Sequence, residues 1–172
     1  MAGRGCHFSI VTVQRSGTHF LTDELFAGWK RCAVNQASDG NGFYLAHFSD
    51  AEYIHRRSEI LCWPMVTSLR NPSALVASHH SRREGCPFLW KELDALLEAD
   101  REVKINYLPL DVPDREEYLN RLNNRYSLAL STDWPIIRSD PIPKKIEDHR
   151  ATRKVWEHYG ELFGRFYERP RD

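Results

Sequence analysis

The chain has 172 residues, of which 41% are hydrophobic and 28% charged, and 24 basic side chains balance 24 acidic ones. This is the profile of a soluble globular protein of one domain, and the balanced charge points to neither nucleic acid nor membrane as a partner. No apolar run is long enough to cross a bilayer, and Met1–Cys6 lacks the apolar core of a signal peptide. The four cysteines form no C-x-x-C pair, which favours free thiols in a reducing cytoplasm over zinc or disulfides.

Near the start of the chain, a buried-strand pattern leads into a short polar turn. Residues Phe8–Val13 are mostly apolar and β-branched, which is typical of a buried strand. Gln14–Thr18 breaks this run with small, polar and cationic residues, and an amphipathic helix is predicted to follow. Because exposed backbone N–H groups and the positive end of a helix dipole attract anions, this turn fits a phosphate-binding loop. An ordinary connection between a strand and a helix fits it equally well. The apolar residues at helical spacing are Phe20, Leu21, Leu25 and Trp29.

Strand and helix patterns alternate along the rest of the chain. We predict that residues 1–172 form a single three-layer α/β domain with a central, mainly parallel sheet of about four or five strands flanked by helices. The further predicted strands are Gly42–His47, Leu61–Leu69 and Glu102–Leu108. The predicted helices are Asp50–Glu59, Pro72–Ser78, Leu89–Leu97, a helix that opens at Pro113-Asp114, and Lys144–Tyr167, with loops at Cys32–Gly42 and Ser131–Pro143.

Polar residues with chemical potential follow several of the predicted strands. In an open parallel sheet, ligands bind at the carboxyl ends of the strands. Arg15–Thr18, His47 and Arg70 each stand at such an end. Ser78 lies on the helix after Arg70, whose first turn suits Pro72. Because Arg70 belongs to the strand end, its side chain and that of Ser78 can close on one ligand group.

Two of these segments resemble a known family. Arg15-Ser-Gly-Thr18 after a strand resembles the P-loop-like 5′-phosphosulfate loop of sulfotransferases, which use 3′-phosphoadenosine 5′-phosphosulfate. Arg70-Asn-Pro-Ser-Ala-Leu-Val-Ala-Ser78 resembles the family's R-N/D-P-x-x-x-x-x-S element, which grips the 3′-phosphate. His47 lies between them, at the end of a strand where many cytosolic members place their catalytic base. The resemblance covers roughly Phe8 to His80.

The resemblance implies a role for each matching residue. His47 would remove the proton of the acceptor hydroxyl, and Arg15 would stabilise the charge that builds on the bridging oxygen. Arg70 and Ser78 would bind the 3′-phosphate. The other implied nucleotide contacts are Ser16, Gly17 and Thr18 at the 5′-phosphate and sulfonate, His19 in the same loop, and Phe20 and Tyr107 near the adenine.

The donor implied by the resemblance is 3′-phosphoadenosine 5′-phosphosulfate, which leaves as 3′-phosphoadenosine 5′-phosphate, and no metal is needed. The implied acceptor is a hydroxyl or amine of a small molecule or carbohydrate, whose identity stays open, as does the oligomeric state. His19, His79 and His80 also form a candidate metal cluster, but adjacent histidines on a helix point in different directions. Placement in solvent or in the acceptor cleft is therefore favoured.

Other functions remain as alternatives. A non-catalytic nucleotide-binding or interaction protein on the same scaffold stays open, because the chain is short and Leu45-Ala46 precedes His47 where relatives carry lysine and a small polar residue. A P-loop kinase is disfavoured because the G-x-x-x-x-G-K-[ST] pattern is absent. A phosphatase is disfavoured because none of the cysteines begins a C-x-x-x-x-x-R loop.

Overall fold

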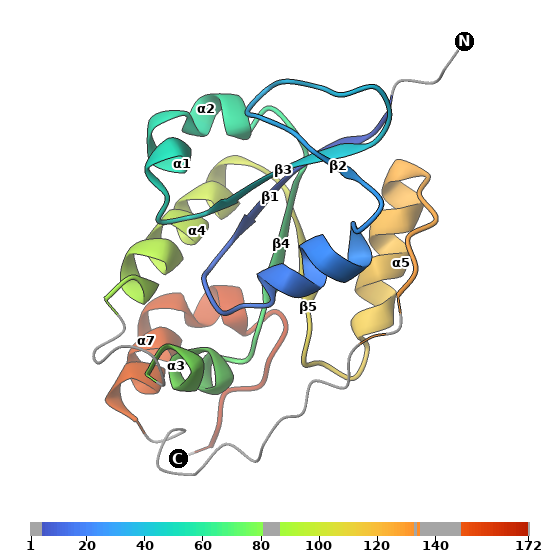
Figure 1. Cartoon of the computed structure of the whole chain (residues 1–172). Helices are drawn as coiled ribbons and strands as arrows, with labels where there is room; N and C mark the ends of the chain where they lie inside the picture. Colours follow the sequence, from blue (N-terminus) through green and yellow to red (C-terminus); the bar gives the residue numbers. More distant parts are fainter. Residues whose placement is uncertain (1–4, 81–86, 133, 135–148, 172) are drawn as a thin grey trace.

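The computed structural model describes residues 5–80, 87–132, 134 and 149–171. In this part of the chain five strands form one parallel sheet in the order β2–β3–β1–β4–β5 (Figure 1). The prediction of an α/β fold with a parallel central sheet is confirmed. The strands are β1 (His7–Thr12), β2 (Lys30–Arg31), β3 (Gly42–His47), β4 (Met65–Leu69) and β5 (Ile105–Pro109).

Helices cover both faces of this sheet, which gives three layers. Side chains alternate between the two faces along each strand. Val11 and Met65 belong to the core shared with α1–α4 and α7, whereas Ile10 and Val66 belong to the core shared with η1 and α5. The helical segments are the π-helical η1 (Phe20–Leu25), α1 (Ala51–His55), α2 (Arg57–Ile60), α3 (Pro72–His80), α4 (Leu89–Glu102), α5 (Arg115–Tyr126) and α7 (Arg150–Phe163).

Several boundaries differ from the predicted ones. The helix after the polar turn ends at Leu25, because Trp29 closes a separate turn onto Phe26 O and β2 follows directly. Leu61 and Cys62 finish the turn of α2, so β4 begins only after Pro64. The predicted helix at residues 50–59 is divided into α1 and α2 at Arg56, whose φ is −114°.

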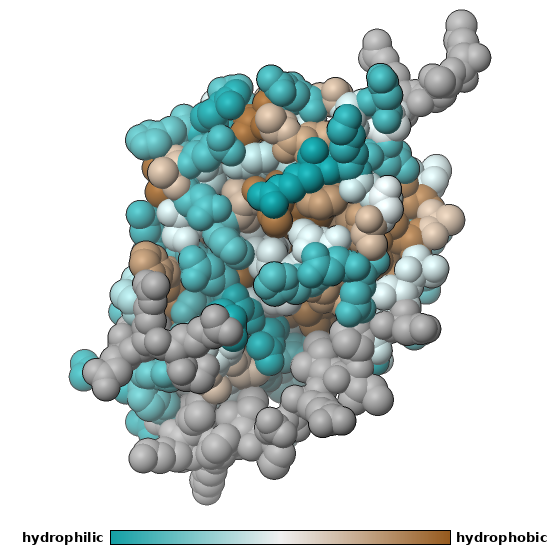
Figure 2. All heavy atoms as spheres, in the orientation of Figure 1, coloured by the Kyte–Doolittle hydropathy of each residue, from teal (hydrophilic) through white to brown (hydrophobic). Residues whose placement is uncertain are grey.

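The structure describes only some of the residues in the C-terminal part of the chain. Helix α7 begins at Arg150, and residues 144–148 of the predicted helix lie outside the described residues. Most of the predicted loop at residues 131–143 lies outside them as well. Within the described ranges, no helix is both long and apolar enough to cross a membrane. The face drawn in Figure 2 carries mostly hydrophilic side chains, with smaller hydrophobic areas between them.

Candidate functional site

A cleft of about 560 Å³ lies at the carboxyl ends of β1, β3 and β4. This is the edge at which ligands bind in open parallel sheets. The cleft therefore brings together segments that are far apart in the sequence. Its walls include most of the residues predicted to act in the site, namely Arg15, Gly17, Thr18, His19, His47, Arg70 and Ser78.

The loop after β1 has an unusual backbone conformation. Arg15 and Gly17 have φ values of 67° and 107°. Ser16 between them does not have a positive φ, so the sign alternates along the loop. Such alternation aims successive backbone N–H groups into a concavity that suits an anion. The φ of Gly17 favours glycine, and a Cβ there would lie 2.1 Å from Leu110 Cδ1, so the Leu110 side chain would have to shift.

Ser16 shapes this loop from the inside. Its side chain is fully buried, and its Oγ donates to the carbonyl of Val13 at 2.6 Å. Its backbone N–H bonds the same carbonyl at 3.2 Å. Both donors that the sequence assigned to a phosphate are thus used within the loop. The donors that line the cleft come from its neighbours.

The loop and the Arg70 element meet directly in the cleft. Arg15 Nε donates to Ser78 Oγ at 3.1 Å, and Arg70 Nη1 donates to the carbonyl of Arg15 at 3.2 Å. Arg70 Nε is buried and has no hydrogen-bond partner among the described residues. Because Arg70 lines the cleft and carries a full positive charge, its guanidinium would attract an anionic group that enters.

The start of α3 is fixed by capping contacts. Asn71 Oδ1 accepts the backbone N–H of Ser73 at 3.0 Å, which is the bond of a helix N-cap. The carboxylate of Asp111, just after β5, accepts the backbone N–H of Asn71 at 2.9 Å. These contacts hold the helix that carries Ser78 at a fixed distance from Arg70.

His47 ends β3 and is coupled to the loop through a buried hydroxyl. Its Nδ1 lies 3.1 Å from Thr12 Oγ1, which in turn lies 2.8 Å from Thr18 Oγ1. Its backbone N–H donates to Asp50 Oδ2 at 2.7 Å. In the described part of the chain no hydrogen bond involves Nε2 of His47, and this nitrogen can therefore serve an incoming hydroxyl. The sequence did not reveal Thr12, which reads as one more β-branched strand residue.

Two predicted adenine contacts lie away from the cleft walls. Phe20 is buried in the core under η1, and its ring stacks on that of Trp134 with centroids 4.9 Å apart. The hydroxyl of Tyr107 donates to Asp100 at 2.6 Å. Tyr107 lines a second, smaller cavity together with Phe166. Neither residue lines the cleft that holds the other predicted site residues.

The histidines of the candidate metal cluster have separate partners. His19 contacts Asp23 at 3.3 Å, His79 contacts the carbonyl of Gln14 at 3.1 Å, and the ring of His80 stands edge-on to that of His149. No group of His, Cys, Asp and Glu residues suited to a metal ion occurs within the described residues. The ring of His79 instead hydrogen-bonds the backbone of the loop after β1.

Glu92 is a further residue that sequence reasoning missed. It is fully buried in α4, and its Oε2 accepts the backbone N–H of Gln14 at 2.5 Å. Burial raises the pKa of this carboxyl to about 7. One signal was present in the sequence, because helical spacing puts Glu92 on the same face as Leu89, Leu93 and Leu96.

No protein-family model matches this chain, and no curated protein or solved structure matches it either. Its function must therefore be argued from the cleft itself. The cleft combines an anion-suited loop, a second cationic element and a histidine on one sheet edge. Such a site can hold a ligand with two anionic groups and can take up a proton next to one of them.

Proposed function

We propose that the protein is a sulfotransferase that uses 3′-phosphoadenosine 5′-phosphosulfate. The observation that carries this proposal is the meeting of the two motifs, in which Arg15 Nε bonds Ser78 Oγ and Arg70 Nη1 bonds the carbonyl of Arg15. His47 lines the same cleft. A nucleotide with phosphate groups at both its 5′ and 3′ positions needs two such anion-binding elements, whereas a single phosphate needs one.

In the proposed site, the loop holds the 5′-phosphosulfate and the Arg70 element holds the 3′-phosphate. His47 accepts the proton of the acceptor hydroxyl through Nε2, while Thr12 fixes the ring through Nδ1. The acceptor oxygen then bonds to sulfur as the bond from sulfur to the bridging phosphate oxygen breaks. Arg15 stabilises the negative charge that develops on that bridging oxygen, and 3′-phosphoadenosine 5′-phosphate leaves.

A transfer assay tests this proposal. The protein is incubated with sulfur-labelled donor and a panel of phenols, sugars and amines, and label is followed from the nucleotide to the acceptor. We expect labelled product with at least one acceptor class. If ATP with magnesium binds the protein more tightly than 3′-phosphoadenosine 5′-phosphate does, the proposal fails.

A further outcome separates catalysis from binding. Tight binding of 3′-phosphoadenosine 5′-phosphate with no transfer to any member of the panel, and no slow release of sulfate from the donor, would favour the non-catalytic nucleotide-binding alternative. Release of sulfate to water would instead show that the transfer chemistry is present and that the acceptor is missing from the panel.

A further inference from the structure

Two ionisable side chains hold the residue that precedes Arg15. The backbone N–H of Gln14 donates to Glu92 Oε2 at 2.5 Å, and its carbonyl accepts from His79 Nε2 at 3.1 Å. Because a carbonyl oxygen only accepts, Nε2 of His79 carries the proton. Helices α4 and α3 therefore grip the two polar backbone groups of one loop residue.

Glu92 is an unusual residue at its position, because burying a carboxyl destabilises the fold. It is fully buried on the apolar face of α4, where an ionisable carboxyl is unfavourable unless it is hydrogen-bonded. Its second oxygen accepts from Ser49 Oγ at 3.2 Å, two residues after His47. The carboxyl thus ties the loop after β1 to the chain that follows β3. If this position only filled space in the core, leucine would stabilise the fold more than glutamate does.

The backbone conformation of this loop needs contacts that stabilise it. Arg15 adopts a left-handed φ of 67°, a conformation that side chains with a Cβ avoid. Residues in such conformations persist where their surroundings fix them, and they are concentrated at ligand-binding sites. The contacts at Gln14 fix the backbone immediately before Arg15, and the bond from Arg70 to the carbonyl of Arg15 fixes it immediately after.

We propose that Glu92 is a positioning residue, which holds Gln14 so that Arg15 and residues 16–18 keep their anion-binding conformation. His79 supports the same residue from the other side. The inference rests on the proposed function, because the anion that the loop would bind is the nucleotide of that proposal. The contacts of Gln14 are present without any ligand.

The charged groups around Glu92 determine how its hydrogen bond to Gln14 depends on pH. Asp50, after β3, faces the carboxyl and adds to burial in raising its pKa. On the opposite side of Gln14, burial lowers the pKa of His79, and the nearby charges of Arg15 and His80 lower it further. Burial thus favours the neutral form of both side chains, and the carboxyl of Glu92, with a pKa of about 7, changes its protonation state near neutral pH.

The first test compares the affinity of 3′-phosphoadenosine 5′-phosphate for Glu92→Ala, Glu92→Gln and Leu96→Val, measured by calorimetry beside thermal unfolding. Glu92→Ala removes the acceptor for Gln14 and should weaken binding about tenfold. Glu92→Gln keeps an acceptor oxygen and should restore most of that affinity. Leu96→Val weakens the packing of the same helix without touching Gln14, and its affinity should stay within about twofold of the unmodified protein.

The second test needs no nucleotide. The amide proton shift of Gln14 is followed by NMR from about pH 5 to about pH 9. It should titrate in the unmodified protein and in Leu96→Val, and it should lose that titration in Glu92→Gln. A Gln14 shift that titrates identically in Glu92→Gln, or equal affinities for Glu92→Ala and Leu96→Val, would overturn the inference. If the nucleotide does not bind while the titration depends on Glu92, the proposed function fails and the hold on Gln14 stands.

Discussion

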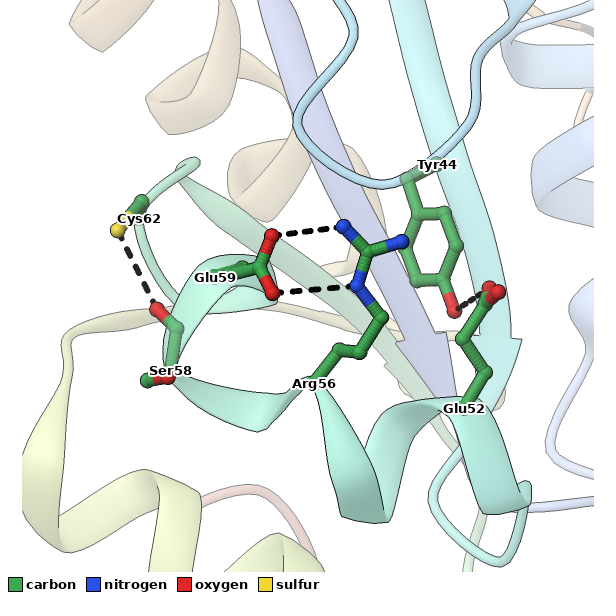
Figure 3. Close-up of polar contacts among 6 residues, drawn as sticks. All are labelled: Tyr44, Glu52, Arg56, Ser58, Glu59 and Cys62. Atoms are coloured by element: carbon green, nitrogen blue, oxygen red, sulfur yellow. Dashed lines mark hydrogen bonds and ion pairs between the residues drawn. The ribbon is translucent and has the colours of Figure 1, made fainter.

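Two arginines, Arg56 between α1 and α2 and Arg70 after β4, differ in how their charge is balanced. On the α1–α2 side, Arg56 donates to both carboxylate oxygens of Glu59 at 3.2 and 2.7 Å, and Tyr44 donates to Glu52 at 2.7 Å (Figure 3). At the cleft, Arg70 donates to the neutral carbonyl of Arg15 and forms no ion pair within the described residues. The first charge is neutralised by the chain itself, whereas the second can be neutralised by a ligand.

The two regions also differ in how far apart their partners lie in the sequence. Arg56 and Glu59 are three residues apart, so local helical structure is enough to pair them. Arg15 and Ser78 are 63 positions apart, and Arg70 and Arg15 are 55 apart. The cleft contacts therefore exist only in the folded sheet. What distinguishes the cleft is that the guanidinium of Arg70 has no carboxylate partner among the described residues, whereas Arg56 has one.

The largest effect is expected at the histidine of the cleft. His47→Ala should lower the rate of sulfuryl transfer about 10²–10⁴-fold, because it removes the proposed general base. Affinity for 3′-phosphoadenosine 5′-phosphate should change little. His55→Ala, an exposed histidine at the end of α1, is the matched control and should retain full transfer. If His47→Ala retained full transfer activity, His47 would not be the general base.

Gly17 is expected to give the next largest effect. Gly17→Ala puts a side chain at a φ of 107° and forces Leu110 Cδ1 to shift, and we expect it to lower the free energy of unfolding by about 3 kcal/mol. Denaturant titration measures this change. Gly28→Ala is the control, since a Cβ there meets nothing within 4 Å. Equal stability of the two variants would contradict the described shape of the loop.

Glu92 is expected to give an effect that depends on pH and is at most as large. Burial raises the pKa of its carboxyl from 4.5 to about 7, so the folded protein keeps a proton that the unfolded chain releases. The stability that this proton contributes is complete below pH 4.5 and is lost as the pH rises to about 7. Relative to Glu92→Gln, the unmodified protein should therefore lose up to about 3 kcal/mol across this range.

Denaturant titrations at several pH values measure that loss. Glu98→Gln, an exposed glutamate on the same helix, should follow the unmodified protein. Parallel stability curves for the unmodified protein and Glu92→Gln would mean that Glu92 has the same pKa in the folded and unfolded states.

Local patterns in the sequence predicted much of this fold. The run of apolar residues gave β3 its observed bounds, Gly42–His47, and strands alternating with helices predicted the parallel sheet. The same alternation predicted that Arg15, His47 and Arg70 would share one edge, because parallel strands end together. In the structure all three residues line one cleft.

The contacts that hold the site could not be predicted in the same way. Glu92 and Gln14 are 78 positions apart, and their distance is decided by how α4 packs on the sheet. The stacking of Phe20 on Trp134 likewise joins η1 to a residue beyond α5. Side-chain partners across such separations depend on packing, which a single sequence read by periodicity does not contain.

We propose that the cleft binds two phosphate groups at separate places, one of them at Arg70. Calorimetric titration of 3′-phosphoadenosine 5′-phosphate, adenosine 5′-monophosphate and adenosine 3′-monophosphate tests it most directly, with Arg70→Ala and Arg56→Ala as paired variants. We predict that the bisphosphate binds at least about tenfold more tightly than either monophosphate. Arg70→Ala should erase its advantage over the 5′-monophosphate, and Arg56→Ala should preserve it. Equal affinities for the bisphosphate and the 5′-monophosphate in the unmodified protein would show that Arg70 binds no second phosphate.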